Sequence, residues 1–440
     1  MRSAARLASV IEILEKVEDE NLNIDHLLIR YFKQRRYAGS KDRRQIRERI
    51  YRIVRNRFKL EWWLQEVIEE RYTSRLLVLS DLAFFEFCSQ SELDEIFNGA
   101  ANNPERLSQK EKEIYQALVG KDICHVKMPT NVKFECPDWI FAKLEPVFGG
   151  ELEKCLVGLG EEASLDLRVN ALKGITREQV QILLEKFDIK AEKTKYSPLG
   201  LRIHSRRRID QIKPFRDGLL EIQDEGSQII SMLVDAKPGM QIADFCSGAG
   251  GKTLAMGSFM ANKGRILALD TSLTRLDKAA LRIKRAGLHN VERRLIGGEA
   301  DPKLKRLAKK FDRVLVDAPC SGIGTWRRDP DIRQRLNRTN LEAMVQMQQK
   351  ILTAAARLVR PGGRLIYATC SLIPDENEKQ IENLLIKRND YSIVSVKEIW
   401  SKLDPKIEKW HGMVNDNMMR LTPHQHGTDG FFISILERLH

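Results

Sequence analysis

Residues 240–253 read MQIADFCSGAGGKT, a short β-rich run followed by a loop of small residues that leads into a helical pattern. Similar β-rich runs occur at 265–270 (RILALD), 312–317 (DRVLVD) and 364–369 (RLIYAT), each followed by a turn and a helix-like stretch. This alternation predicts a doubly wound α/β domain with a mostly parallel sheet. Ligands of such sheets bind beyond the carboxyl ends of the strands, so the residues directly after these runs are the candidates for an active site.

The loop after the first run has the small residues that let a ligand approach the backbone at a helix N-terminus. A phosphate-binding P-loop would need Gly where Cys246 stands, and the dinucleotide fingerprint would need Gly where Thr253 stands, so both patterns fail. Asp270 ends the second run, where a carboxylate can accept hydrogen bonds from both ribose hydroxyls. An adenosine-containing ligand is therefore expected, and these two elements alone leave NAD and S-adenosylmethionine open.

The third and fourth runs each end close to a cysteine. Asp317 is followed by Ala-Pro-Cys320, and Thr369 by Cys370, after which residues 374–378 predict a helix start with acids in its first turn. A lone cysteine is usually a packed core residue, but two on the ligand side of one sheet indicate chemistry. A thiolate that adds to C6 of cytosine makes C5 able to attack an electrophilic methyl group, while a carboxyl holds N3. Asp317, Cys320 and Cys370 are therefore predicted to be catalytic.

The segment from Ala4 to about Gly120 has apolar residues at three- and four-residue spacing, which predicts an all-α domain at residues 1–125. Between Arg30 and Lys59 there are thirteen Lys or Arg and two acids, with aromatic side chains interleaved. A merely solvated helix usually mixes both signs of charge, so this excess favours contact with an RNA backbone.

Residues 126–214 are predicted to form a small α/β subdomain, because strand-like runs at 165–170 and 201–204 flank a helical stretch at 176–187. The basic stretch Ser205–Arg208 follows, where it can hold RNA. We interpret His204 beside it as a backbone contact or surface residue rather than a catalytic base. Residues 215–440 then form the catalytic α/β domain.

The chain of 440 residues carries a net charge of +13, which fits a nucleic acid or an anionic membrane surface as partner. No apolar run approaches the roughly 20 residues of a membrane span, and the N-terminus has no signal-peptide core. The seven cysteines include no CxxC pair, which indicates reduced thiols in the cytoplasm rather than disulfides or zinc. We expect no metal and a monomer.

Five stretches together resemble the Sun (Fmu, or RsmB-like) family of bacterial ribosomal RNA cytosine-C5 methyltransferases. The resemblance covers about residues 130–440 well, while the N-terminal segment, with Ser40–Arg44, looks more loosely like a NusB-type RNA-binding domain. The matching stretches are Gln223–Gln228, Asp244–Thr253, Asp317–Gly322, Tyr367–Ser371 and Asp429–Phe432.

The resemblance implies a Rossmann-like methyltransferase domain that uses S-adenosylmethionine and acts on a cytosine of small-subunit ribosomal RNA. It implies that Cys370 is the nucleophile and that Cys320 assists release of the methylated product, whereas in DNA cytosine methylases the Pro-Cys cysteine attacks. Asp317 is expected between cofactor and base. The expected cofactor contacts are Cys246, Ser247, Gly248, Ala249, Gly250, Gly251, Lys252, Asp270, Arg275 and Asp317.

Two positions depart from the family pattern. Ala249 stands where the family usually has Pro, and Ala keeps the turn small. The family usually has an Asp near the adenine in the stretch matching residues 296–301; here Glu299 or Asp301 takes that place, or the contact is absent and the cofactor binds more weakly. A non-catalytic RNA-binding or assembly protein of the same fold fits the second departure. A nucleotide-dependent oxidoreductase leaves the two thiols unexplained.

Overall fold

The chain forms two compact units in its computed structural model, which describes residues 1–20, 23–69, 71–204, 208–403 and 413–439. The first unit comprises Met1–Gly160 with Asp329–Leu336, and the second comprises Glu161–Arg328 with Asn337–His440. Of the predicted basic stretch Ser205–Arg208, only Arg208 lies within the described residues. Within these ranges every helix is too short or too polar to span a lipid bilayer.

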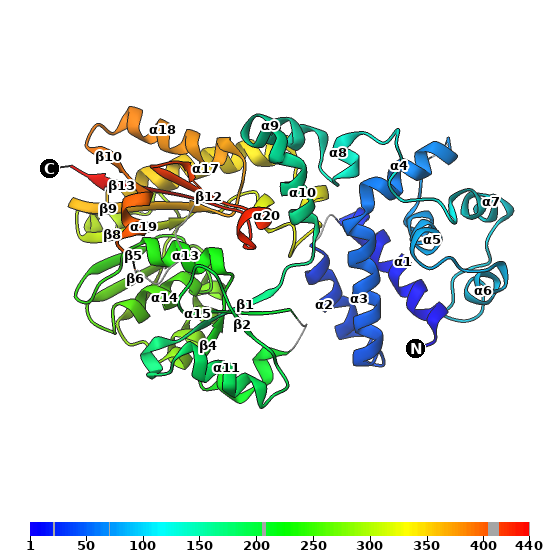
Figure 1. Ribbon diagram of the computed structural model, residues 1–440, viewed down its shortest axis with the longest axis horizontal. Helices are drawn as coiled ribbons and strands as arrows, with labels where there is room; N and C mark the ends of the chain where they lie inside the picture. The colour runs from blue at the N-terminus through cyan, green and yellow to red at the C-terminus, as the bar shows by residue number, and fades with distance from the viewer. Residues whose placement is uncertain (21–22, 70, 205–207, 404–412, 440) are drawn as a thin grey trace. The chain divides into compact units, whose positions relative to one another are not determined.

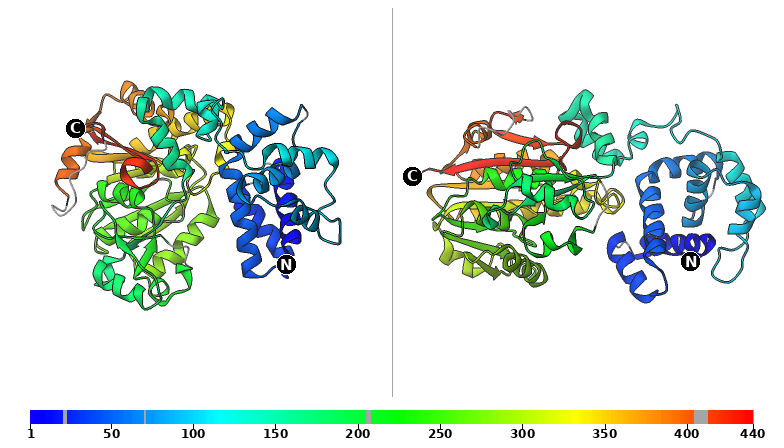
Figure 2. Two further views of the ribbon diagram at one scale, coloured as in Figure 1. Left: turned by 45° about the vertical axis from the view of Figure 1, so that its right-hand side comes forward. Right: turned by 60° about the horizontal axis from the view of Figure 1, so that its bottom comes forward.

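The first unit is helical, as predicted, and its helices α1 to α8 (blue to cyan in Figure 2) pack around one apolar core. The basic stretch is amphipathic: Ile46, Ile50 and Ile53 of α3 are buried in that core. Several of its cations have a structural partner. Arg49 and Arg52 bind the buried carboxylate of Asp81, and further ion pairs join Arg35, Arg44, Arg47 and Arg57 to Glu12, Glu48, Asp25 and Glu61. The helices are α1 (Ser3–Glu20), α2 (Ile24–Gln34), α3 (Ser40–Arg55), α4 (Arg57–Val67), α5 (Ser74–Phe85), α6 (Gln90–Ile96), α7 (Gln109–Leu118), α8 (Thr130–Lys133), α9 (Asp138–Phe148), α10 (Leu152–Gly160) and α16 (Ile332–Arg335).

The second unit begins with a small antiparallel sheet in the order β2-β3-β1-β4. The predicted helix lies over it as α11, which starts at a capping box made by Thr176 and Gln179. The elements are β1 (Leu165–Val169), α11 (Arg177–Glu185), β2 (Glu192–Lys193), β3 (Gly200–Ile203), α12 (Lys213–Arg216) and β4 (Leu220–Ile222).

The larger sheet has the order β11-β12-β13-β9-β8-β5-β6-β7 in the described part of the chain, with β10 paired to β13. Strands β7, β6, β5, β8 and β9 run parallel, whereas β10 to β13 are antiparallel to their neighbours. The four predicted runs are therefore confirmed as β5, β6, β8 and β9. The strands are β5 (Gln241–Asp244), β6 (Arg265–Asp270), β7 (Val291–Leu295), β8 (Phe311–Asp317), β9 (Val359–Thr369), β10 (Tyr391–Val394), β11 (Met413–Asn415), β12 (Met418–Leu421) and β13 (Phe431–Arg438).

Helices cover both faces of this sheet (Figure 1). On one face α17 and α18 bury apolar side chains against it, and on the other α13, α14 and α19 do so. The chain order reverses between β5 and β8, which is the switch point where such sheets bind ligands. The helices are α13 (Glu225–Leu233), α14 (Gly251–Phe259), α15 (Leu273–Ala286), α17 (Arg338–Ala356), α18 (Glu378–Lys387), α19 (Val396–Ser401) and α20 (Pro423–His426).

Candidate active site

The glycine-containing loop lies between the end of β5 and the start of α14. Gly248 and Gly250 have φ values of +55° and +83°, a region that favours glycine. A Cβ atom on Gly248 would meet no atom within 4 Å, so the backbone there faces open space. The loop is anchored on both sides, because Ser247 N–H donates to Leu269 O at 2.9 Å and Arg282 donates to Ala249 O at 2.9 Å. The arrangement leaves backbone accessible at the switch point of the sheet.

Asp270, at the end of β6, supports this loop. Its Oδ2 accepts the Gly248 amide at 2.8 Å, and its Oδ1 accepts the Ser272 amide at 2.8 Å. Each carboxylate oxygen has a second lone pair, which leaves one acceptor site on each for a ribose hydroxyl. Arg275 lies exposed in the first turn of α15, and its amide donates to Ser272 Oγ at 3.4 Å. The structure thus brings Asp270, but not the Arg275 side chain, into the polar contacts of the loop.

Asp244 is a buried acid at the end of β5 that the sequence did not single out as a site residue. Its Oδ2 accepts from Thr253 Oγ1 at 2.6 Å. Among the residues that the structure describes, Asp244 Oδ1 and the nearby Ser247 Oγ have no hydrogen-bond partner. Buried polar atoms are nearly always satisfied, so these two oxygens suit donor groups of a bound ligand. A strand-end acid beside the predicted loop was the signal available in the sequence.

The buried Asp244 carboxyl makes stability depend on pH. Burial, opposed by the Thr253 hydrogen bond and reinforced by the charge of Asp317, raises the pKa of Asp244 to about 7. Because the folded carboxyl binds its proton more tightly than the unfolded one, its contribution is complete below pH about 4 and is lost as the pH rises through about 7. The side chain of Asp244→Asn cannot ionise. In urea titrations we therefore expect the wild type to lose about 3 kcal/mol more unfolding free energy than this variant between pH 5 and pH 8. Parallel pH curves for the two proteins would show instead that folded Asp244 is already ionised at pH 5.

Asp317, at the end of β8, forms an ion pair with Lys252 of α14. The Lys252 Nζ to Asp317 Oδ2 distance is 2.7 Å, and Nζ lies 5.9 Å from the ring centroid of Phe431. Burial disfavours the charged ammonium, but the charge of Asp317 and their hydrogen bond outweigh it and raise the pKa of Lys252. Lys252, predicted as a cofactor contact, therefore holds the strand-end carboxylate.

The two strand-end thiols lie together. Cys320 Sγ and Cys370 Sγ are 3.3 Å apart, and their loops are joined by a hydrogen bond from Gly324 N–H to Cys370 O at 2.9 Å. The hydrogen bond to Cys370, then burial, raise the pKa of Cys320 well above its usual range. Cys320 is thus held as a neutral S–H that can donate to the Cys370 sulfur.

A buried glutamate connects the two cysteine loops. Glu376 Oε1 accepts from Ser321 N–H at 2.8 Å and from Gln348 Nε2 at 3.0 Å, while Oε2 accepts from Ser321 Oγ at 2.5 Å and from Ser371 Oγ. The predicted helix start at 374–378 is a 3-10 turn over Pro374–Glu376, after which α18 begins at Glu378. Sequence placed an acid in this turn, but could not show that its side chain points inward.

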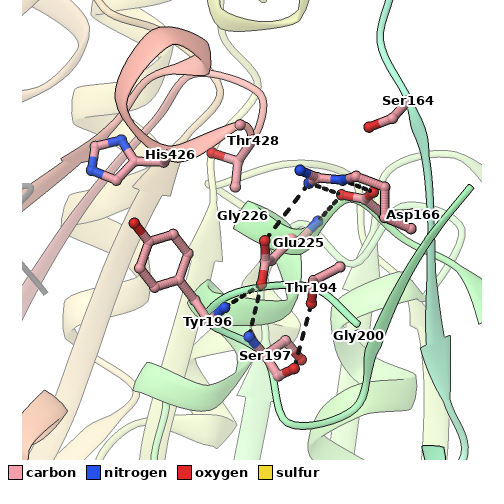
Figure 3. A network of polar contacts seen from close by, with 12 residues as sticks. Ser164, Asp166, Thr194, Tyr196, Ser197, Gly200, Glu225, Gly226, His426 and Thr428 are labelled. Atoms are coloured by element: carbon pink, nitrogen blue, oxygen red, sulfur yellow. Dashed lines mark hydrogen bonds and ion pairs between the residues drawn. The ribbon is translucent and has the colours of Figure 1, made fainter. Parts of the chain in front are cut away.

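The small sheet is joined to the helices of the larger sheet through Glu225 of α13. Figure 3 shows Glu225 accepting the amides of Tyr196 and Ser197, at 2.6 and 2.8 Å, while its own amide donates to Asp166 at 3.0 Å. Arg328, eight residues after Cys320, bridges Asp224 and Asp429 at 2.9 and 2.6 Å. These contacts join the segments around 224 and 429, which the sequence matched to the family without assigning them roles, to the segment that follows the Cys320 loop.

The remaining sequence candidates lie outside these contacts. Asp301 caps its own turn, because it accepts the amides of Gly297 and Lys303 at 2.8 Å each. Glu299 is partly buried and lines a cavity of about 330 Å³ with Lys305 and Arg357. His204 is exposed, 3.5 Å from the carboxylate of Glu192. Like Asp270, Asp301 keeps a second lone pair on each oxygen, so Glu299 and Asp301 both stay candidates for the adenine contact.

Comparisons with known proteins agree with this architecture. The family model described as 16S rRNA methyltransferase RsmB/F matches residues 231–437, and the model of the RsmF/B-like ferredoxin-like domain matches residues 136–210. A probable ribosomal RNA small subunit methyltransferase B of Synechocystis sp. is 32% identical over 79% of this chain and 74% of its own length. The Proteus mirabilis ribosomal RNA small subunit methyltransferase B is 25% identical over the whole of both chains. The crystal structure of PH0851 has a TM-score of 0.79 at 25% identity and covers 100% of this chain and 99% of its own.

Proposed function

The chain belongs to the RsmB/F methyltransferase family, and from that premise we propose that it methylates C5 of a cytosine in small-subunit ribosomal RNA through a covalent cysteine–C6 adduct. The observation that carries this proposal is the pair of thiols 3.3 Å apart beside Asp317. A single thiol would support many functions. Two thiols in contact at the ligand end of a methyltransferase sheet suit a reaction in which one sulfur attacks and the other assists release.

The cofactor of this family is S-adenosylmethionine, and the loop fits it. Gly248 leaves open space over the backbone, and Asp270 has acceptor sites for the hydroxyls of a ribose. Asp244 Oδ1 and Ser247 Oγ can accept hydrogen bonds from donor groups of the cofactor. When bound, the cofactor supplies an electrophilic methyl group. Residues Cys246 to Lys252 with Asp270 would hold it, and Arg275 stays a proposed contact at the rim.

On the protein side, Cys370 is the proposed nucleophile. Cys320 keeps its proton, because the hydrogen bond with Cys370 and burial raise its pKa, and its S–H can donate to the Cys370 sulfur. Attack at C6 forms a carbon–sulfur bond and pushes electron density to C5. As the adduct forms, N3 takes a proton from water, and the Asp317 carboxylate, held by Lys252, accepts from this N3–H and from the exocyclic amine. Once C5 has taken the methyl group, its proton passes to water, and the electrons of that C–H bond re-form the C5–C6 double bond as the carbon–sulfur bond breaks. N3 gives up its proton, and Cys370 leaves as a thiolate, which the Cys320 S–H assists by donating a hydrogen bond to it.

The other parts of the chain have proposed roles in holding RNA. We place an RNA-binding domain at residues 1–125, an RNA-positioning subdomain at 126–214 and the catalytic domain at 215–440. The ferredoxin-like match at 136–210 and the basic stretch in α2 and α3 support the first two roles. The protein is proposed to act in the cytoplasm as a monomer, with ribosomal RNA as its partner and without a metal.

Ribosomal RNA from a strain lacking the gene tests the reaction. Bisulfite mapping is expected to show the loss of 5-methylcytosine at a position of the small-subunit RNA. The wild-type gene should restore the mark, and a Cys370→Ala gene should not. If 5-methylcytosine is unchanged while a different methylated nucleoside disappears by mass spectrometry, the proposed product is wrong.

Asp270→Asn tests the cofactor site. The amide that replaces one carboxylate oxygen cannot accept a backbone N–H or a ribose hydroxyl, so we expect the affinity for S-adenosylmethionine to fall about 10- to 100-fold. Titration calorimetry measures the change, and Asp277→Asn on the exposed side of α15 is the matched control. Absence of cofactor binding by the wild-type protein at millimolar concentration would favour a non-catalytic assembly protein instead.

A further inference from the structure

We infer that Glu376 is a positioning residue that sets the separation of the two site thiols, by holding the residue that follows each of them. Ser321 follows Cys320 and Ser371 follows Cys370, and both bind the same carboxylate. The catalytic meaning of this contact rests on the proposed function. The geometric part, that Glu376 fixes the distance between Cys320 and Cys370, stands on the contacts alone.

The carboxylate is entirely enclosed. Glu376 and Ser371 have no exposed surface, and Ser321 is 5% exposed. The donors around Glu376 are uncharged N–H and O–H groups: the Ser321 amide, two serine hydroxyls and the side-chain amide of Gln348. Several hydrogen bonds to one buried anion form a network with little freedom, because breaking any of them leaves a buried charge less well satisfied.

The network reaches both cysteine loops from more than one direction. Gln348 of α17 also donates to Pro319 O at 2.9 Å, which is the residue before Cys320. Tyr367 of β9 donates to the backbone oxygen of Glu376 at 2.7 Å, and Asn377 donates to Ser371 O at 3.0 Å. Residues on both sides of Cys320 and on the far side of Cys370 are thus fixed to one turn, Pro374–Glu376.

The proposed reaction requires the two sulfurs to keep a fixed separation, and the contacts of Glu376 maintain it. Two sulfurs that act in succession on one base must both remain within reach of it, and a displacement of about 1 Å can cost about 100-fold in rate. The fold brings Cys320 and Cys370 to adjacent strands, but their loops are irregular and need a separate restraint. A shared carboxylate acceptor supplies that restraint through the two serines that follow the thiols.

Thiol crosslinking measures the separation directly, without RNA or cofactor. Diamide accepts two electrons and two protons from a pair of thiols and leaves a disulfide, so its rate of reaction reports how readily Cys320 and Cys370 meet. Mass spectrometry of tryptic peptides identifies the Cys320–Cys370 product. We expect the Glu376→Ala variant to form this disulfide at least about tenfold more slowly than the wild type. The matched control, Asp375→Asn, should form it at the wild-type rate. Asp375 lies in the same turn, but binds Lys379.

Turnover provides the second readout. For Glu376→Ala we expect kcat to fall at least about tenfold, while KM for RNA stays within about twofold of the wild-type value. A denaturant-stable protein–RNA adduct should also accumulate, because Cys320 is no longer held beside Cys370 to assist release. Simple destabilisation would lower both steps together and leave no adduct. Glu376→Gln keeps an acceptor for the Ser321 amide and a donor for the serine hydroxyls, so it should fold even if the alanine variant does not. We expect its crosslinking rate and kcat to fall as well, but by less than in Glu376→Ala.

Wild-type crosslinking rates in both Glu376 variants, whatever their activity, would overturn the inference. Slowed crosslinking with normal turnover would overturn its catalytic part. If instead the crosslinking result is as expected but the wild-type protein forms no 5-methylcytosine, the proposed function fails while the geometric role of Glu376 stands.

Discussion

Cys370→Ala is expected to abolish methyl transfer, with a rate at least about 10⁴-fold below that of the wild type, as for other enzymes that lose a covalent nucleophile. Without the Cys370 sulfur no bond to C6 forms, and C5 of cytosine is not nucleophilic enough to react. We do not expect the Cys320 thiol to replace it, because Cys320 remains buried in the variant, and burial alone still raises its pKa. Transfer of a radiolabelled methyl group from the cofactor to ribosomal RNA measures the loss.

The control is another cysteine. Cys124 is an exposed thiol of the first unit, so Cys124→Ala should methylate RNA at the wild-type rate. Cofactor affinity should also be unchanged in Cys370→Ala, since the glycine loop and Asp270 are intact. If Cys370→Ala remains active while Cys320→Ala loses adduct formation, the two thiols have the opposite roles, as in DNA cytosine methylases.

Cys320→Ala is expected to trap the enzyme on its substrate. Attack by Cys370 still occurs in this variant, but the step that breaks the carbon–sulfur bond loses its assisting thiol. The adduct should therefore accumulate to a large fraction of the enzyme, where the wild type shows almost none, and turnover should stop after about one cycle. A denaturing gel with labelled RNA measures the complex.

The double variant Cys320→Ala/Cys370→Ala separates covalent trapping from tight binding. We expect it to give no denaturant-stable complex, because the attacking sulfur is gone. Adduct formation in the double variant would assign the covalent bond to a residue other than either thiol.

Much of the fold was predictable because local pattern and topology agree. Buried parallel strands read as continuous apolar runs, so β5, β6, β8 and β9 were identified, and the loops after them gave Asp270, Asp317, Cys320 and Cys370. Strand β7 was missed. Its sequence, Val291–Leu295, contains three charged residues, because it forms the edge of the sheet and is partly exposed.

The rest depended on contacts between distant segments. No local pattern shows that Lys252 pairs with Asp317, 65 residues away, or that Glu376 reaches Ser321, 55 residues away. The antiparallel strands β10 to β13 were also not predicted. Strands β10 to β12 are short, and β13 pairs with the end of the parallel sheet rather than repeating the parallel alternation. Burial decides such pairings, and burial follows only from the assembled fold.

The covalent intermediate is the central claim, and its attachment site is the most direct test. Cys320→Ala is incubated with ribosomal RNA and S-adenosylmethionine, digested with ribonuclease and trypsin, and sequenced by mass spectrometry. We predict a peptide that carries the mass of a methylated cytidine nucleotide on Cys370. A nucleotide attached to any other residue, or unmodified Cys370 peptide alongside RNA that has been methylated, would contradict the mechanism.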